Sequence, residues 1–350
     1  MNNRRIVVSE LNKHKIGVTI IIPVYNAQKY LRKCLDSLLN QTYQNYEVLM
    51  VNDGSTDRSA EILEEYADNY KDKFKLFHKE NGGQSSARNL ALPHVSGEYI
   101  TFLDSDDYYE KHYLEYLYVA AKKNDSDMVI SGQKKVDENG KVYLSIDYDI
   151  KKYPNCILRR LNFSGKLYKT EYMRKHKMKF AVGKTYEDNP FNFVMIFLAK
   201  NLVILPYSGY YQVGHPGSTT TKKIVEERLP YKEIAKAIDY VLKHKDEIND
   251  YSIFEFTILS FFTYFIFQAN KKHMYLSLED RKSDTKVIQN LCEYVMRILK
   301  KYFPKYWKNE HLGITKNPEL QLTQRVGTKV FVILCRLNLL KSFATLYYKL

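Results

Sequence analysis

The first third of the chain alternates four short apolar runs with polar turns and with segments of helical periodicity. The runs are VTIIIPVYN (18–26), EVLMV (47–51), FKLFH (74–78) and EYITFL (98–103). Runs rich in β-branched residues and without polar alternation are typical of strands covered on both faces. Strands that alternate with helices form parallel sheets with right-handed crossovers. The pattern therefore predicts an α/β fold built on a parallel sheet.

Polar residues gather where each predicted strand ends. They are Tyr25-Asn26, Asn52-Asp53, the Gly82-Gly83 loop and the acidic run from Asp104 to Asp107. Ligands of parallel α/β sheets bind beyond the carboxyl ends of the strands. One such cluster is compatible with any surface turn, but four clusters at one edge of one sheet predict a binding site there.

The run YITFLDSDDYYEKHYL (99–114) places three carboxylates within four residues, directly after a buried strand. Charges this close repel one another, so the cluster costs stability unless a cation or hydrogen bonds offset the repulsion. Carboxylates at spacing i, i+2 can share one divalent cation, which in turn binds a diphosphate. We therefore expect a metal or nucleotide site at this position.

Other interpretations of the acidic run stay open. A solvated surface turn would also be acidic, and Asp107 alone suits the first turn of a helix. An aspartyl phosphotransferase would use Asp104 as its nucleophile. An EF-hand loop is excluded because its sixth position would be Tyr109 where glycine is required.

The chain of 350 residues carries a net charge of +14, which indicates an anionic partner such as phosphate, nucleic acid or an acidic membrane surface. The charge is uneven, because residues 251–350 hold 16 Lys and Arg against 7 Asp and Glu, with no acidic residue after Glu319. The basic residues form no recognised nucleic-acid-reading motif, so we expect no nucleic-acid partner.

Four widely spaced cysteines without a CxxC pair indicate neither a zinc site nor a disulfide framework, and they suit a reducing cytoplasm. The N-terminal residues have no long apolar core typical of a secretory signal. The most apolar stretch, FTILSFFTYFIFQAN (256–270), is short for a membrane span and more typical of a buried helix. We expect a cytoplasmic location, peripheral at the inner face of the cell membrane.

Four motifs in order resemble glycosyltransferase family 2 with the GT-A fold: IIPVYNAQKYLRKCLDSLLNQT, EVLMVNDGSTDRS, NGGQSSARN and YITFLDSDD. The resemblance is strong over residues 18–131 and weaker to about residue 221, through GKLYKTE, YEDNPF and GYYQVGHPGSTTT. It implies a Rossmann-like mixed sheet flanked by helices. A mainly helical C-terminal extension would follow.

The resemblance also implies a role for each matching residue. Pro23, Tyr25 and Asn26 of the PVYN turn would form a uridine pocket together with Asp53. Tyr25 would stack on the base, and Asp53 would accept a hydrogen bond from it. The plainer interpretations are strand-end packing for Tyr25 and turn formation before Gly54 for Asp53.

Further nucleotide contacts are implied in the next two motifs. Gly83, Arg88 and Asn89 of NGGQSSARN would contact the donor, with the Arg88 guanidinium suited to phosphate or ribose. Asp104 would contact ribose or metal-bound water, with Ser105 beside it. For Arg88 the plainer interpretation is a solvated helix residue.

The remaining implied roles are metal binding and catalysis. Asp106 would bind a divalent metal (Mn or Mg) directly, and His215 of VGHPGS would be a further ligand, unless it is only a loop residue. In YEDNPF, Asp188 would be the base that deprotonates the acceptor hydroxyl, with Glu187 helping to bind the acceptor. Acids before Pro190 are also common at a helix N-terminus.

We expect three segments: an N-terminal lead (1–17), a GT-A domain (18–223) and a basic helical region (224–350) that serves as a membrane-surface or acceptor-side subdomain. The tail predicts one apolar helical stripe. Its members are Val326, Val330, Ile333, Leu337, Leu340, Ala344 and Tyr347. Basic amphipathic helices of this kind bind anionic membrane surfaces, although packing on the catalytic domain is the plainer interpretation.

The sequence thus predicts an inverting, metal-dependent glycosyltransferase that uses a nucleotide-sugar, most simply a UDP-sugar. Its acceptor would be a glycan or a lipid-diphosphate-linked sugar in capsule or exopolysaccharide synthesis. The alternatives are an aspartyl phosphotransferase that uses Asp104 and a non-catalytic nucleotide- or glycan-binding protein at the membrane surface. The donor sugar, the linkage and the oligomeric state are not predicted.

Overall fold

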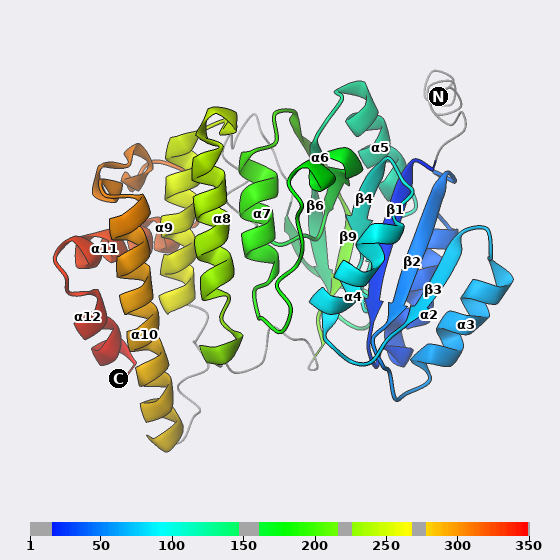
Figure 1. Cartoon of the computed structure of the whole chain (residues 1–350), viewed down its shortest axis with the longest axis horizontal. Helices are drawn as coiled ribbons and strands as arrows, with labels where there is room; N and C mark the ends of the chain where they lie inside the picture. Colours follow the sequence, from blue (N-terminus) through cyan, green and yellow to red (C-terminus); the bar gives the residue numbers. More distant parts are fainter. Residues whose placement is uncertain (1–15, 147–160, 216–225, 268–277, 349–350) are drawn as a thin grey trace.

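A computed structural model describes residues 16–146, 161–215, 226–267 and 278–348. The expected N-terminal lead (1–17) falls almost wholly outside these residues, and so does the expected domain boundary at residue 223. Figure 1 shows the sheet with its flanking helices in one half of the molecule and a stack of helices in the other.

One mixed sheet of nine strands forms the described part of the first half. The strands are β1 (Val18–Val24), β2 (Tyr46–Asn52), β3 (Phe74–His78), β4 (Tyr99–Phe102), β5 (Tyr108–Tyr109), β6 (Met128–Val136), β7 (Val142–Ile146), β8 (Lys166–Lys169) and β9 (Leu202–Val213). Their order is β3-β2-β1-β4-β8-β6-β9-β5, and β7 pairs with β6.

The first four strands are parallel, as the repeated pattern predicts. From β8 onward the sheet is mixed, because β8 runs antiparallel to β4 and β6 while β6 and β9 are parallel. The predicted fold class, a Rossmann-like mixed sheet flanked by helices with a mainly helical C-terminal extension, is therefore confirmed.

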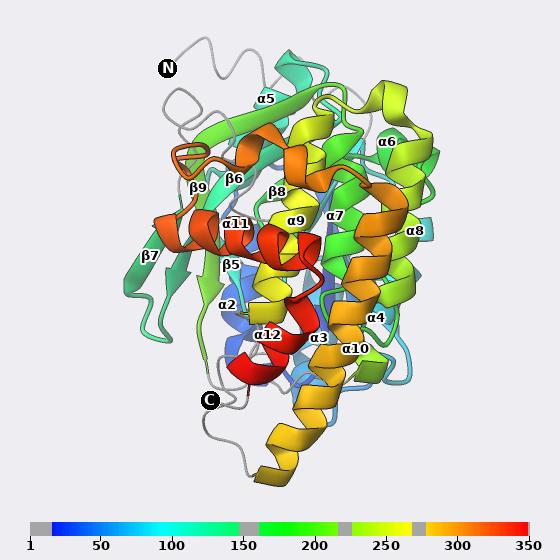
Figure 2. The same cartoon turned by 90° about the vertical axis from the view of Figure 1, so that its left-hand side faces the viewer.

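The helices lie on both faces of the sheet and beyond its β9 side (Figures 1 and 2). They are α2 (Gln28–Leu39), α3 (Ser59–Asn69), α4 (Gln84–Ala91), α5 (Tyr113–Lys123), α6 (Thr170–Lys175), α7 (Asp188–Phe197), α8 (Tyr231–Lys243), α9 (Tyr251–Phe267), α10 (Leu278–Tyr302), α11 (Leu322–Arg336) and α12 (Leu340–Tyr347). Short 3₁₀ turns span Leu92–His94, Glu226–Arg228, Lys245–Glu247, Tyr306–Lys308 and Glu310–Leu312.

Strand β1 is buried on both faces, as its unbroken apolar run requires. Ile20 and Ile22 belong to the apolar layer that α2, α3 and α5 cover. Ile21 belongs to the opposite layer, which α4 covers and which continues into the C-terminal helices. The period-2 alternation of side chains thus divides one strand between two cores.

The C-terminal helices share this second core. Phe193 of α7 packs edge-on against Phe261 of α9, and Phe197 packs against Phe254. The apolar run predicted to be a buried helix is α9, which ends at Phe267 and is buried along most of its length. Within the described residues, every helix is too short or too polar to cross a membrane.

The predicted single stripe of the tail is partly wrong. The helix is interrupted between α11 and α12, where Asn338 adopts φ 58°, a left-handed conformation that ends helices. Leu340 and Ala344 are buried after this break, whereas Val330 and Leu337 before it are exposed. The apolar spacing of the tail continues across residues 326–347, so it predicts one unbroken helix. Asn338 in the left-handed conformation nevertheless separates α11 from α12.

The structure predicts opposite effects for two Gly→Ala substitutions. In Gly97→Ala the new Cβ would lie 2.5 Å from the backbone nitrogen of Thr19, which cannot move without distorting β1. The free energy of unfolding should therefore fall by about 2 kcal/mol. In Gly327→Ala, within α11, the nearest atom is a methyl of Thr263 at 3.7 Å. Alanine there should stabilise the chain by about 0.5–1 kcal/mol, because glycine is the poorer helix former. Urea unfolding would test both, and equal shifts in the two variants would contradict the packing.

Candidate active site

The loops after β1 and β2 are held together at the carboxyl edge of the sheet. Asn26 has φ 49°, a left-handed conformation that Asn tolerates better than most residues. Its side-chain carbonyl accepts the Thr56 N–H at 2.8 Å, and its amide donates to the Thr56 hydroxyl at 3.3 Å. Tyr25, directly before it, is 50% exposed. The residue predicted to stack on the base therefore has an accessible ring at this edge.

Asp53 is buried and anchors the glycine loop. One carboxylate oxygen accepts the Gly82 N–H at 3.0 Å, and the other accepts the Gly83 N–H at 2.7 Å. The Lys79 ammonium lies 2.5 Å from the first oxygen. Gly83 adopts φ 84°, which strains any residue with a Cβ, and it leads directly into α4. A hydrogen bond from a base to Asp53 would have to share an oxygen with these donors.

Arg88 of α4 lies at the centre of the site with its side chain fully buried. One guanidinium nitrogen donates to Asp104 at 2.8 Å, and another donates to Glu187 at 3.1 Å. The guanidinium also lies 4.1 Å from the ring centre of Phe163 and 5.2 Å from that of Phe180. A buried cation requires such paired anions, so Arg88 links the acidic run after β4 to the acidic pair at the start of α7.

The acidic run forms one compact cluster after β4. Carboxylate oxygens of Asp104, Asp106 and Asp107 lie within 4.8 Å of one another. Burial is the main cause that raises the pKa of Asp104 to about 6. Burial, together with the charges of the two neighbours, raises the pKa of Asp107 well above its ordinary value. The Tyr210 hydroxyl and the Val213 N–H hold Asp107 at 2.7 and 2.8 Å.

His215 lies beside this cluster, far along the chain from it. Its Nε2 is 2.7 Å from a carboxylate oxygen of Asp106. Its ring stacks on Tyr30 of α2, with centroids 4.8 Å apart, and the Tyr30 hydroxyl donates to Glu138 at 2.5 Å. The histidine is therefore positioned by α2 and faces the same acids that the sequence assigns to the metal.

The acidic pair begins α7 on the other side of Arg88. Tyr186, directly before the pair, adopts φ 57°, which is costly for an aromatic residue and is found where the surrounding structure imposes it. Glu187 is buried and bonded to Arg88. Burial, followed by the charge of Glu187, raises the pKa of Asp188 to about 7, although Arg88 and Lys166 oppose the shift. Asp188 thus titrates close to neutral pH, the range suited to a general base.

Three other predicted residues have mainly structural contacts. Pro23 is buried within β1, in register with Val51 of β2. The Asn89 amide donates to the Phe180 carbonyl, and its carbonyl accepts the Phe180 N–H, both at 2.8 Å. Ser105 lies between the acids and is half-buried. Contacts of these residues with a nucleotide stay predictions.

Sequence reasoning missed three residues of this cluster. The Gln84 amide donates to Glu187 at 2.6 Å, and its carbonyl accepts from Arg88 at 3.3 Å. Lys166 is buried near Asp188, and the Tyr210 hydroxyl bonds to the acidic run. Gln84 precedes Arg88 by one helical turn, so its spacing was a usable signal. Lys166 and Tyr210 are brought in by β8 and β9, which no local pattern places here.

The acidic cluster fits a divalent metal on the chemistry of its donors. Three carboxylates and an imidazole converge from one loop and from the end of β9, and hard cations such as Mn²⁺ and Mg²⁺ prefer oxygen ligands. Burial first, and the charges of neighbouring carboxylates second, raise the pKa of Asp104 and of Asp107, and a bound cation would favour the ionised form of both.

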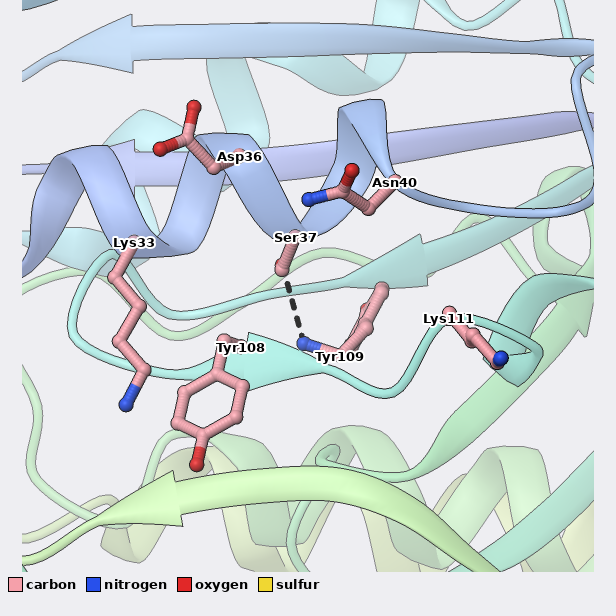
Figure 3. Close-up of a pocket in the computed structure, with 7 residues that line it drawn as sticks. All are labelled: Lys33, Asp36, Ser37, Asn40, Tyr108, Tyr109 and Lys111. Atoms are coloured by element: carbon pink, nitrogen blue, oxygen red, sulfur yellow. Dashed lines mark hydrogen bonds between the residues drawn. The ribbon is translucent and has the colours of Figure 1, made fainter.

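A separate surface cavity of about 440 Å³ lies between α2 and β5. Figure 3 shows Lys33 and Tyr108 on one side of it and Lys111 on the other, with the Tyr109 N–H donating to the Ser37 hydroxyl at 3.2 Å. Its lining residues include none of the predicted site residues. The cavity is therefore separate from the predicted site residues at the strand ends.

Comparison with known proteins identifies the family of this chain. The model of the family described as Glycosyl transferase family 2 matches residues 19–185. EpsH of Bacillus subtilis (strain 168), a protein assigned as a glycosyltransferase, is 32% identical over 254 residues, which are 67% of this chain and 72% of EpsH. The chain belongs to glycosyl transferase family 2. The glycosyltransferase class predicted from the four motifs is thereby confirmed.

Two further comparisons bear on this family 2 chain. Glycosyltransferase GlyA of Streptococcus pneumoniae serotype 4 is 36% identical over 210 residues, but these are 55% of this chain and only 30% of GlyA. The chain therefore spans less than a third of that relative. The crystal structure of S. aureus TarS 1-349 in complex with UDP-GlcNAc matches 92% of each chain with a TM-score of 0.66 at 22% identity, which establishes the shared fold.

Replacing Asp188 with Asn should stabilise this family 2 chain, and more so at higher pH. The folded-state pKa of Asp188, about 7, lies above its ordinary value of 3.8, so ionisation between these values destabilises the native state. The gain in unfolding free energy from Asp188→Asn should therefore grow by roughly 4 kcal/mol between pH 4 and pH 8. Urea unfolding of both proteins across this range would measure it, and a gain that shrinks as the pH rises would contradict the half-buried position of Asp188 beside Glu187.

Proposed function

We propose that the chain is an inverting, metal-dependent transferase that moves a sugar from a UDP-sugar to a hydroxyl acceptor. The observation that carries the proposal is the convergence of two acidic groups on one buried cation. Arg88 bonds to Asp104 of the acidic run and to Glu187 of the acidic pair, so a donor-side and an acceptor-side group are fixed to one another. TarS, which has the same fold, was crystallised with UDP-GlcNAc, and this supports the choice of donor.

The donor would bind across the ends of β1, β2 and β4. The accessible ring of Tyr25 offers a flat face to uracil, and Asp53 offers a carboxylate to the base N–H. Gly83 lets the loop before α4 approach the ligand without a side chain in the way. These side chains would bind and orient the nucleotide before any bond changes.

Asp106 and His215, with Asp104 beside them, would hold Mn²⁺ or Mg²⁺. When bound, this ion supplies charge stabilisation for the diphosphate that leaves. The residues that position these ligands belong to the chain itself: Arg88 orients Asp104, and Tyr30 supports the His215 ring. Second contacts of this kind fix the orientation of metal-binding side chains.

Asp188 would act as the base in a single displacement. The acceptor hydroxyl loses its proton to the Asp188 carboxylate as its oxygen forms a bond to the anomeric carbon. The bond between that carbon and the UDP oxygen breaks, and UDP leaves from the opposite face, so the configuration inverts. Glu187, aligned by Arg88 and Gln84, would bind the acceptor.

We further propose that the acceptor is a glycan or a lipid-diphosphate-linked sugar at the inner face of the cell membrane, in the synthesis of a capsule or exopolysaccharide. The net charge of +14 suits an anionic acceptor and an anionic surface. The helical region 224–350 would then serve as the membrane or acceptor side. An aspartyl phosphotransferase is disfavoured, because the family relationship is to sugar transferases and Arg88 already occupies an oxygen of Asp104.

Release of UDP should require both metal and Asp106. With a panel of UDP-sugars and a mixed glycan acceptor, Mn²⁺ should support release, and a chelator should abolish it. Asp106→Ala should lower the rate by about 100-fold or more, because the diphosphate loses its counter-charge. The matched control Asp239→Ala, on the surface helix α8, should keep the parent rate. Release unaffected by the chelator and by Asp106→Ala would refute the metal assignment.

The rate should rise with pH through about 7. A base works only when ionised, and the pKa of Asp188 is raised to about 7, so kcat/KM at saturating Mn²⁺ should increase tenfold per pH unit below that value and level off above it. Asp188→Asn should remove this dependence along with most of the activity. A parent profile that is flat between pH 5.5 and pH 8 would show that another group is the base.

A further inference from the structure

The outer face of α11 carries an apolar stripe that runs its whole length. Its members are Leu322, Val326, Val330, Ile333 and Leu337, which are 37–59% exposed. Their spacing of three or four residues places them on one side of the helix. The buried face, which includes Phe331 and Cys335, lies on the other side. Single exposed apolar residues are ordinary on a protein surface, but four consecutive turns of them mark an interaction surface.

Helix α12 extends this surface past the break at Asn338. Leu339, Phe343, Leu346 and Tyr347 are 42–57% exposed. Figure 2 shows α11 and α12 together on the side of the molecule that faces the viewer, beyond α9 and α10. The exposed residues of both helices are called the tail surface from here on.

Positive charge lines one edge of the tail surface. Arg325, Lys329 and Arg336 each directly precede a stripe residue, so they form a parallel row about 100° around the helix. Lys329 and Arg336 are exposed. No acidic residue follows Glu319, so the row meets no negative charge on its own helices. Apolar side chains beside a row of cations are complementary to lipid tails beneath anionic headgroups.

A second copy of this chain is a poorer match to the tail surface. Packing the stripes of two copies against one another would bring two chains of +14 net charge together. Neither face would offer an acidic residue to pair with the row of Arg and Lys. Like-charge juxtaposition of this kind disfavours association, whereas an anionic bilayer satisfies both the stripe and the row.

We propose that the tail surface of α11 and α12 binds the chain to anionic membranes, with its apolar side chains inserted among the lipids and its cations at the headgroups. This inference deepens the proposed action at the membrane by naming the surface that makes the contact. It does not depend on the identity of the donor or of the catalytic base.

Flotation of the full-length chain with vesicles tests the proposal without donor or acceptor. Vesicles of phosphatidylcholine with phosphatidylglycerol should carry the chain, and salt should weaken the binding. Val330→Asp and Ile333→Ser should each weaken it about tenfold or more, because the stripe loses apolar contact. Lys329→Gln should weaken it about fivefold on phosphatidylglycerol and leave binding to pure phosphatidylcholine unchanged.

Val182→Asp is the matched control, since Val182 is 54% exposed but lies outside the tail surface, and its binding should equal that of the parent. Circular dichroism and light scattering on each variant report folding and self-association. Failure of the parent to float with phosphatidylglycerol would overturn the proposal. So would parent-like flotation of folded Val330→Asp and Ile333→Ser, or self-association of the parent that Val330→Asp abolishes while no lipid binding is seen. UDP release from a UDP-sugar in the presence of a soluble acceptor does not depend on membrane binding, so the catalytic proposal is tested separately.

Discussion

The buried guanidinium of Arg88 is the interaction on which the rest of the site depends. Burying a cation is costly unless anions surround it, and here Asp104 and Glu187 bond to it from different elements while two aromatic rings flank it. Arg88 bonds to neither Asp106 in the acidic run nor Asp188 in the acidic pair, so one predicted functional acid on each side is not engaged by it. Arg88 thus fixes the centre of an acidic edge, where burial and the nearby carboxylates still raise the pKa of Asp104 and of Asp188.

Much of this architecture is predictable from local sequence. The runs that become β1 to β4 are apolar without alternation, and the polar residues after them do lie at one edge of one sheet. The resemblance to a family of sugar transferases adds roles that spacing alone does not give, and the family is confirmed. The helix of Arg88 was predicted, but the plainer interpretation of a solvated arginine is wrong, because its side chain is buried. Its partners Asp104 and Glu187 lie 16 and 99 residues away in the sequence. Burial that depends on such distant partners has no local signature.

Contacts between distant parts of the chain also explain why two further site residues were not predicted. Lys166 and Tyr210 enter the site on β8 and β9, whose positions follow from the mixed pairing of the sheet and not from their own sequence. The tail shows the opposite error: its periodicity was correct in each helix, but Asn338 turned one predicted stripe into two helices. The break buries Leu340 and Ala344 while it leaves the earlier residues exposed. The backbone conformation of one residue thus determines which apolar side chains of the tail are buried in the core and which are exposed.

The most direct test of the central claim is a crystal structure of the chain with UDP and Mn²⁺, with anomalous scattering used to locate the metal. The account predicts one manganese peak bonded to Asp106, with the diphosphate beside it, the uracil on Tyr25 and the Arg88 ion pairs intact. A nucleotide bound in the cavity between α2 and β5, or manganese bound away from the acidic run after β4, would contradict the account.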